Sequence, residues 1–164
     1  MQSPYPTGSV RHLLQTSRVT SKTREVLEER LAANSSNPQF FDAELFAILQ
    51  AAAARLISQS DQLELIDVAY ALDKRLAEGT GDGWRYNTMP PDPVAHRAGL
   101  RGLEESAHLM FGNGFTSLNG AEQDVVLEAI QQGKALGSIW QQIIAPRYFE
   151  ELLAELTETY YSHP

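Results

Sequence analysis

Two pairs of an acidic residue and a histidine have spacings that could support chemistry. Glu105 and His108 form a Glu-x-x-His pair, which places a carboxylate and an imidazole on one face of a helix. Di-iron bundles need two such pairs and two further glutamates, whereas the pair occurs once here. Asp92 and His96 have the i, i+4 spacing of an acid–base couple, but no nucleophile is evident beside them. A surface glutamate near a partly buried histidine, and a helix-capping aspartate, are the commoner explanations.

A glycine-rich stretch, Gly79-Thr-Gly-Asp-Gly83, could be taken for a phosphate-binding loop. Such a loop follows a strand and opens a helix, whereas this one follows a predicted helix. No Lys-Ser or Lys-Thr pair closes a Walker-type loop, and no nucleophile elbow is present for a Ser-His-Asp triad. We therefore expect a helix C-cap at Gly79. The sequence predicts no catalytic, cofactor-binding or metal-binding residue.

Large side chains in the loop at about 79–92 point to contact rather than catalysis. Three glycines and two prolines exclude a regular element there. The same loop carries residues of the kind that anchor protein interfaces, namely Trp84, Arg85, Tyr86 and Met89. For Trp84, a place in the core of this chain is an equally open alternative.

A second aromatic cluster lies near the end of the chain. Tyr160 and Tyr161 are adjacent in a predicted helix, so they cannot share one face, and at least one should point away from the core. We include both among the candidate partner-binding residues.

Composition excludes several classes of protein. The chain has 164 residues, 43% of them hydrophobic and 21% charged, which is typical of one globular domain. A net charge of −8 argues against binding to a nucleic-acid backbone. The absence of cysteine removes disulfides, thiolate nucleophiles and iron–sulfur clusters. We find no apolar run long enough to span a membrane and expect no export signal, and the compartment stays open.

Helical periodicity runs through most of the sequence, and no useful period-two alternation is present. We predict an all-α fold, a single compact bundle of six or seven helices over 21–164, preceded by a poorly structured arm at 1–20. Predicted helices begin near Thr20 or Ser21, at Asp42, near Asp61, at Asp92, at Asn119, after Leu136 and again from Arg147.

Several helix starts have a specific local signal. Asp61 with Glu64, and Asn119 with Glu122, have capping-box spacing. Asp92 followed by Pro93 reads as an N-cap and first helical residue. In the helix predicted after Asp61, we expect Leu65, Ile66, Ala69, Leu72 and Leu76 to face inward.

An ordered series of short motifs resembles gluconate 2-dehydrogenase subunit 3. The series comprises Phe40-Phe-Asp42, Gly83-Trp-Arg-Tyr86, Met89-Pro-Pro-Asp92, Gly99-Leu100, Phe115 to Leu118, Gln123-Asp124 and Phe149 to Tyr161. The resemblance runs from about Thr20 to Pro164.

This resemblance implies a small, non-catalytic subunit that accompanies a large FAD-dependent dehydrogenase of the glucose–methanol–choline type. Such partners oxidise sugars, sugar acids or polyols, and a cytochrome c subunit often completes the complex. The small subunit is thought to support folding of the flavoprotein, so FAD is expected in the partner and not in this chain. Many family members begin with a twin-arginine signal, which this sequence lacks.

A stand-alone enzyme or ligand-binding bundle remains the alternative from the residues themselves. It would use a pocket between helices with His96, His108 or Glu105 at its mouth.

Overall fold

The computed structural model describes residues 8–32, 37–59, 65–80 and 87–164. Within these ranges the chain is all-helical, as predicted, and no strand is present. The helices, in chain order, are α1 (Ser9–Leu14), α2 (Ser21–Ala32), α3 (Ala43–Leu56), α4 (Val68–Glu78), α5 (Asp92–Phe111), η1 (Phe115–Ser117), α6 (Gly120–Gln131), η2 (Ile139–Gln141) and α7 (Ala145–Ser162), the two η elements being short 3-10 turns.

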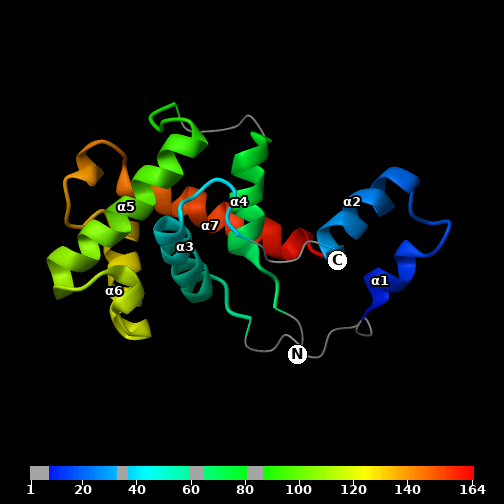
Figure 1. Ribbon diagram of the computed structural model, residues 1–164, viewed down its shortest axis with the longest axis horizontal. Helices are drawn as coiled ribbons and strands as arrows, with labels where there is room; N and C mark the ends of the chain where they lie inside the picture. Colours follow the sequence, from blue (N-terminus) through cyan, green and yellow to red (C-terminus); the bar gives the residue numbers. More distant parts are fainter. Residues whose placement is uncertain (1–7, 33–36, 60–64, 81–86) are drawn as a thin grey trace.

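Five helices, α3 to α7, pack around one core. Helix α5 contacts α3, α6 and α7, while α4 lies against α3 and α7 (Figure 1). The inward face of α5 includes Leu100, Leu103 and Ala107, none of which is exposed to solvent. The spacing of three and four residues places these side chains on one face of the helix.

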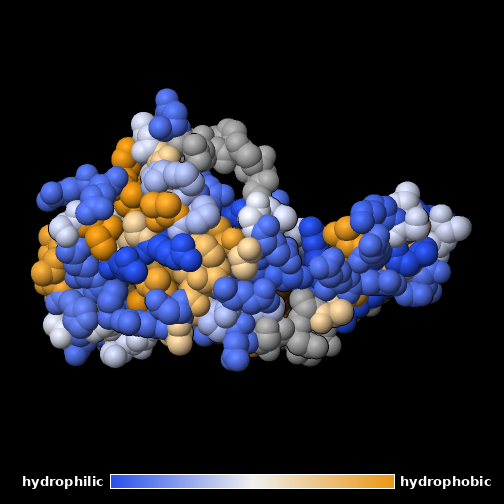
Figure 2. Space-filling view, turned by 45° about the horizontal axis from the view of Figure 1, so that its top comes forward, coloured by the Kyte–Doolittle hydropathy of each residue, from blue (hydrophilic) through white to orange (hydrophobic). Residues whose placement is uncertain are grey.

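Helices α1 and α2 stand out from one side of this bundle, near the C-terminus of the chain (Figure 1). No side chain of α2 is buried, and the surface of the two helices is mostly hydrophilic (Figure 2). The Arg24 guanidinium holds the connection between them, because it donates to the carbonyl oxygens of Leu14, Thr16 and Val19. The predicted N-terminal arm thus contains a short helix, α1, while its residues 1–7 lie outside the described ranges.

Local capping signals located some helix starts correctly. Asp42 caps α3 through a 2.8 Å hydrogen bond from the Leu45 amide. Asn119 and Glu122 form a complete capping box at the start of α6. Gly79 adopts the left-handed conformation at the end of α4, with φ of 65°, which confirms the expected C-cap.

The helix predicted after Leu136 is only the 3-10 turn η2, and the helix start predicted near Asp61 was wrong. Helix α4 begins at Val68 with Asp67 as its cap, and Leu65, expected to face inward, is 77% exposed. The Gln59 side-chain amide donates a 3.0 Å hydrogen bond to the Ile66 carbonyl oxygen and accepts a 2.8 Å hydrogen bond from the Ile66 backbone amide. These bonds hold the backbone of Ile66 outside the helix. Asp61 and Glu64 lie outside the described residues.

Asp92 is the first residue of α5 and not its cap, which is Pro91. Its carboxylate is turned toward Arg75 of α4, 3.5 Å away, instead of toward the amides of its own helix. No helix among the described residues is long and apolar enough to cross a membrane.

Candidate functional site

Arg75, near the end of α4, holds both ends of the loop that joins α4 to α5. Its Nη1 donates to the carbonyl oxygen of Thr80 at 3.2 Å and lies 3.5 Å from the Asp92 carboxylate. Its Nη2 donates to the Glu155 carboxylate on α7. The three charged side chains are 21–26% exposed, so solvent screens them less than a surface pair. One guanidinium therefore ties the two ends of the loop to α7.

His96 of α5 lies beneath this ion-pair network and is 1% exposed. Its Nε2 is 3.9 Å from a carboxylate oxygen of Glu155. The imidazole packs edge-on against Tyr148 of α7, with ring centroids 5.9 Å apart. Burial raises the pKa of the Tyr148 hydroxyl far above its usual range, so this phenol stays neutral. Among the described residues, the side chains around His96 are closely packed and include no nucleophile.

Small residues on α5 allow aromatic rings to approach its backbone. A Cβ at Gly99 would overlap the ring of Tyr148, and one at Gly102 would overlap the ring of Trp140. The Trp140 indole donates a 2.8 Å hydrogen bond to Ser106 on the same face. This face of α5 is thus filled by side chains of the protein itself, which leaves no room there for a ligand.

The Glu-x-x-His pair does not form a site. Glu105 accepts hydrogen bonds from the amides of Ser138 and Ile139, at 2.9 and 3.1 Å, and these bonds lower its pKa. His108 is 56% exposed and lies 3.1 Å from Glu104 instead. The described residues contain no group of three or more His, Asp or Glu side chains that could hold a metal ion. Glu105 is a structural residue that fixes the start of η2.

The predicted contact residues lie in different environments. Trp84, Arg85 and Tyr86 are outside the described residues. Met89 is 5% exposed and belongs to the hydrophobic core, so it packs within this chain and does not offer its side chain to a partner.

The two tyrosines of the C-terminal cluster differ as the helical periodicity required. Tyr160 packs against the core, whereas Tyr161 is 80% exposed. Their rings lie edge to face, with centroids 5.1 Å apart. Of this pair, Tyr161 is the one available to a second molecule.

Asp73 was not identified from the sequence as a structural residue. Asp73 is fully buried and accepts hydrogen bonds from the amides of Gln39, Phe40 and Phe41. It thereby joins the segment before α3 to α4. Its position between the inward Ala69 and Leu76 of one helix face was a usable signal, because a charged residue there must be paired.

The family comparison agrees with the motifs described in the sequence. The family model for gluconate 2-dehydrogenase subunit 3 matches residues 43–164, which include all of helices α3 to α7. No curated protein and no solved structure matches this chain. The family match covers most of the chain and confirms the expected family: the protein belongs to the gluconate 2-dehydrogenase subunit 3 family.

Proposed function

We propose that this chain is a non-catalytic subunit that binds a flavin-dependent dehydrogenase of the glucose–methanol–choline type and supports its folding. The observation that carries the proposal is the family match over the whole five-helix bundle. In this proposal FAD is held by the partner, and a cytochrome c subunit completes the complex. The partner oxidises a sugar or a sugar acid.

The loop at 79–92 is the first proposed contact. Its ends are held to the bundle by Arg75 through Thr80 and Asp92. Fixing the ends of a loop reduces the conformational entropy that is lost when the loop binds. Trp84, Arg85 and Tyr86 are residue types that dominate binding energy at protein interfaces, and they supply the proposed anchors.

The end of α7 is the second proposed contact. Tyr161 exposes 80% of its surface, which is unusual for a large aromatic residue, and tyrosine is enriched at interfaces. The mechanism is linkage: a subunit that binds only the folded flavoprotein stabilises that folded state by mass action.

No observation favours the alternative of a stand-alone enzyme or ligand-binding bundle. It required His96, His108 or Glu105 at the mouth of one pocket. In the structure His96 is buried, His108 faces Glu104 at the surface, and Glu105 accepts a hydrogen bond from the Ser138 amide. The three side chains therefore do not line one pocket.

Affinity capture of this chain from its native host, followed by mass spectrometry and a visible spectrum, tests the proposal. We expect a stoichiometric flavoprotein whose spectrum shows oxidised flavin. A solitary, colourless chain would contradict the proposal, and so would a partner that holds no flavin. Capture with the Trp84→Ala and Tyr86→Ala double variant provides the control for adventitious binding.

A further inference from the structure

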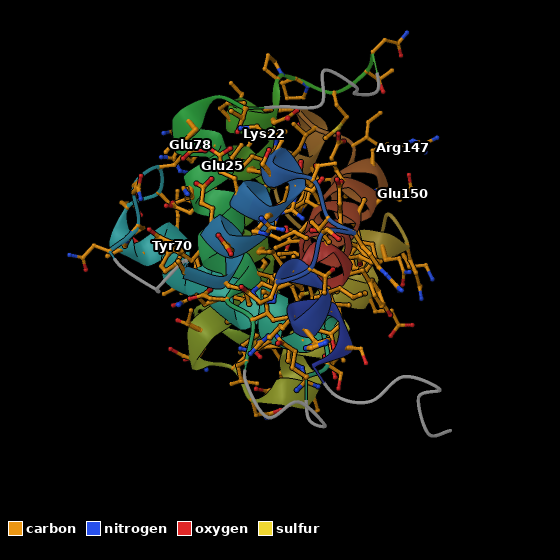
Figure 3. The ribbon with its side chains drawn as sticks, turned by 90° about the vertical axis from the view of Figure 1, so that its right-hand side faces the viewer. Lys22, Glu25, Tyr70, Glu78, Arg147 and Glu150 are labelled. Atoms are coloured by element: carbon orange, nitrogen blue, oxygen red, sulfur yellow. The ribbon has the colours of Figure 1, made fainter. Side chains whose placement is uncertain are left out.

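A groove of about 740 Å³ lies between α2, α4 and α7. Figure 3 looks toward α2, with Tyr70 and Glu78 of α4 on one side of this helix and Glu150 of α7 on the other. Apolar side chains in its lining include Val26, Ile66 and Ala154. The groove therefore combines apolar surface with charged walls.

Acidic residues dominate these walls. Seven carboxylates line the groove, against the three cationic side chains of Arg30, Lys74 and Arg75. Exposed Glu158 makes no hydrogen bond or ion pair with another described residue. The net charge of the groove lining is negative, as is the charge of the whole chain, −8. The electrostatic potential in the groove is therefore negative.

The three cations are already engaged within the protein. Lys74 lies 2.9 Å from Glu29 and 3.7 Å from Glu78. Arg75 pairs with Glu155, and Arg30 donates to the carbonyl oxygen of Ser162. An occupant of the groove must therefore bring the positive charge itself.

Helix α2 forms a wall that polar contacts hold in place. None of its side chains is buried, and the Glu29–Lys74 and Arg30–Ser162 contacts join it to α4 and α7. Exposed polar contacts of this kind contribute little free energy. The wall can therefore adjust to an occupant at small cost.

The groove is continuous with the proposed loop contact. Arg75 and Glu155 line it, and the same Arg75 holds Thr80 and Asp92 at the ends of the loop. The two described ends of the loop are thus held next to the groove. The volume corresponds to about two turns of an α-helix about 10 Å across.

We propose that this groove binds a cationic, amphipathic helical segment of the dehydrogenase subunit, an inference that rests on the proposed function. Lysine or arginine side chains of that segment pair with carboxylates such as Glu78 and Glu158. Its apolar face covers Val26, Ile66 and Ala154. The groove supplies charge complementarity, which sets orientation and association rate, while the aromatic loop supplies anchoring contacts.

Charge reversal in the full chain tests this inference. Glu158→Lys should raise the Kd for the purified flavoprotein about tenfold at low salt and weaken the salt dependence of binding. Glu28→Lys is the matched control, because Glu28 is an exposed glutamate of α2 that does not line the groove. Circular dichroism of both variants establishes that they fold.

Photo-crosslinking then identifies the occupant. A p-benzoylphenylalanine in place of Ala154 should crosslink to a segment of the flavoprotein rich in lysine or arginine. Equal affinity of wild type and Glu158→Lys, or a crosslink to an acidic segment, overturns the groove assignment while the proposed function stands. If the wild-type chain does not bind the flavoprotein at all, the proposed function fails and the groove assignment fails with it.

Discussion

Arg75 and Glu155 join α4 to α7, and the same guanidinium contacts Asp92 at the start of α5. Two consecutive helices and the distant α7 therefore meet at one cation. Because Thr80 also accepts a hydrogen bond from Arg75, this network determines where the loop at 79–92 leaves and rejoins the bundle. It is the structural basis on which the proposed contact surface rests.

Loss of the Arg75 cation should destabilise the bundle and release the loop. Arg75→Met keeps most of the apolar stem but leaves the Glu155 carboxylate without its partner, next to buried His96. We expect the free energy of unfolding in urea to fall by about 1–3 kcal/mol, since the pair is only partly buried. Adding Glu155→Gln should recover part of the loss, because no unpaired carboxylate then remains. If the losses of the two single variants simply add in the double variant, the two side chains are not coupled and the ion-pair network is contradicted.

Asp73 should be a major determinant of the link between the segment at 37–41 and α4. Asp73→Asn removes the charge and places an amide donor against backbone amides, so we expect a loss of about 2–3 kcal/mol in urea unfolding. Asp124→Asn is the control, because Asp124 pairs with Arg55 at the surface and should have a much smaller effect. Similar losses for both variants would show that burial of Asp73 does not matter.

The attachment of η2 to α5 should weaken in acid. Hydrogen bonds from the Ser138 and Ile139 amides lower the pKa of Glu105 below its usual 4.5. A lowered carboxyl pKa contributes stability that is present above 4.5 and is lost as the pH falls through the lower, folded-state value. The stability difference between wild type and Glu105→Gln should therefore shrink below pH 4.5.

Urea midpoints for both proteins across this range measure the difference, with Trp140 of η2 as a fluorescent reporter. A difference that stays constant down to strongly acid pH would contradict the role of the Glu105 carboxylate.

The aromatic loop should contribute binding energy more than stability. Trp84→Ala combined with Tyr86→Ala should weaken binding of the flavoprotein by at least ~2 kcal/mol if both are interface anchors. Isothermal titration gives the affinity, and thermal unfolding of the free chain gives its stability. A large fall in melting temperature with little change in affinity would place Trp84 in the core instead.

Local signals predicted local structure well. The capping box of Asn119 and Glu122 and the Asp42 cap involve residues three apart in sequence, so their pattern is readable without the fold. The predicted start of α4 was wrong because the Gln59 side chain forms hydrogen bonds with the backbone of Ile66, seven residues later in the chain. Such a contact depends on the tertiary path of the chain.

The ion-pair network that holds the ends of the loop could not be predicted from local sequence signals. Arg75, Asp92 and Glu155 come from three helices, and no local sequence pattern indicates that their side chains are in contact. Asp92 was expected to cap its own helix, and its carboxylate is turned to Arg75 instead. For Tyr160 and Tyr161, by contrast, helical geometry alone required that one point outward, and Tyr161 does.

FAD loading of the flavoprotein directly measures whether this chain supports maturation of its proposed partner. The captured dehydrogenase subunit would be expressed with the wild-type chain, with the Trp84→Ala and Tyr86→Ala double variant, and alone. We expect a high soluble yield and a FAD-to-protein ratio near one only with the wild-type chain. Equal yield and equal FAD content in all three cases would contradict this expectation.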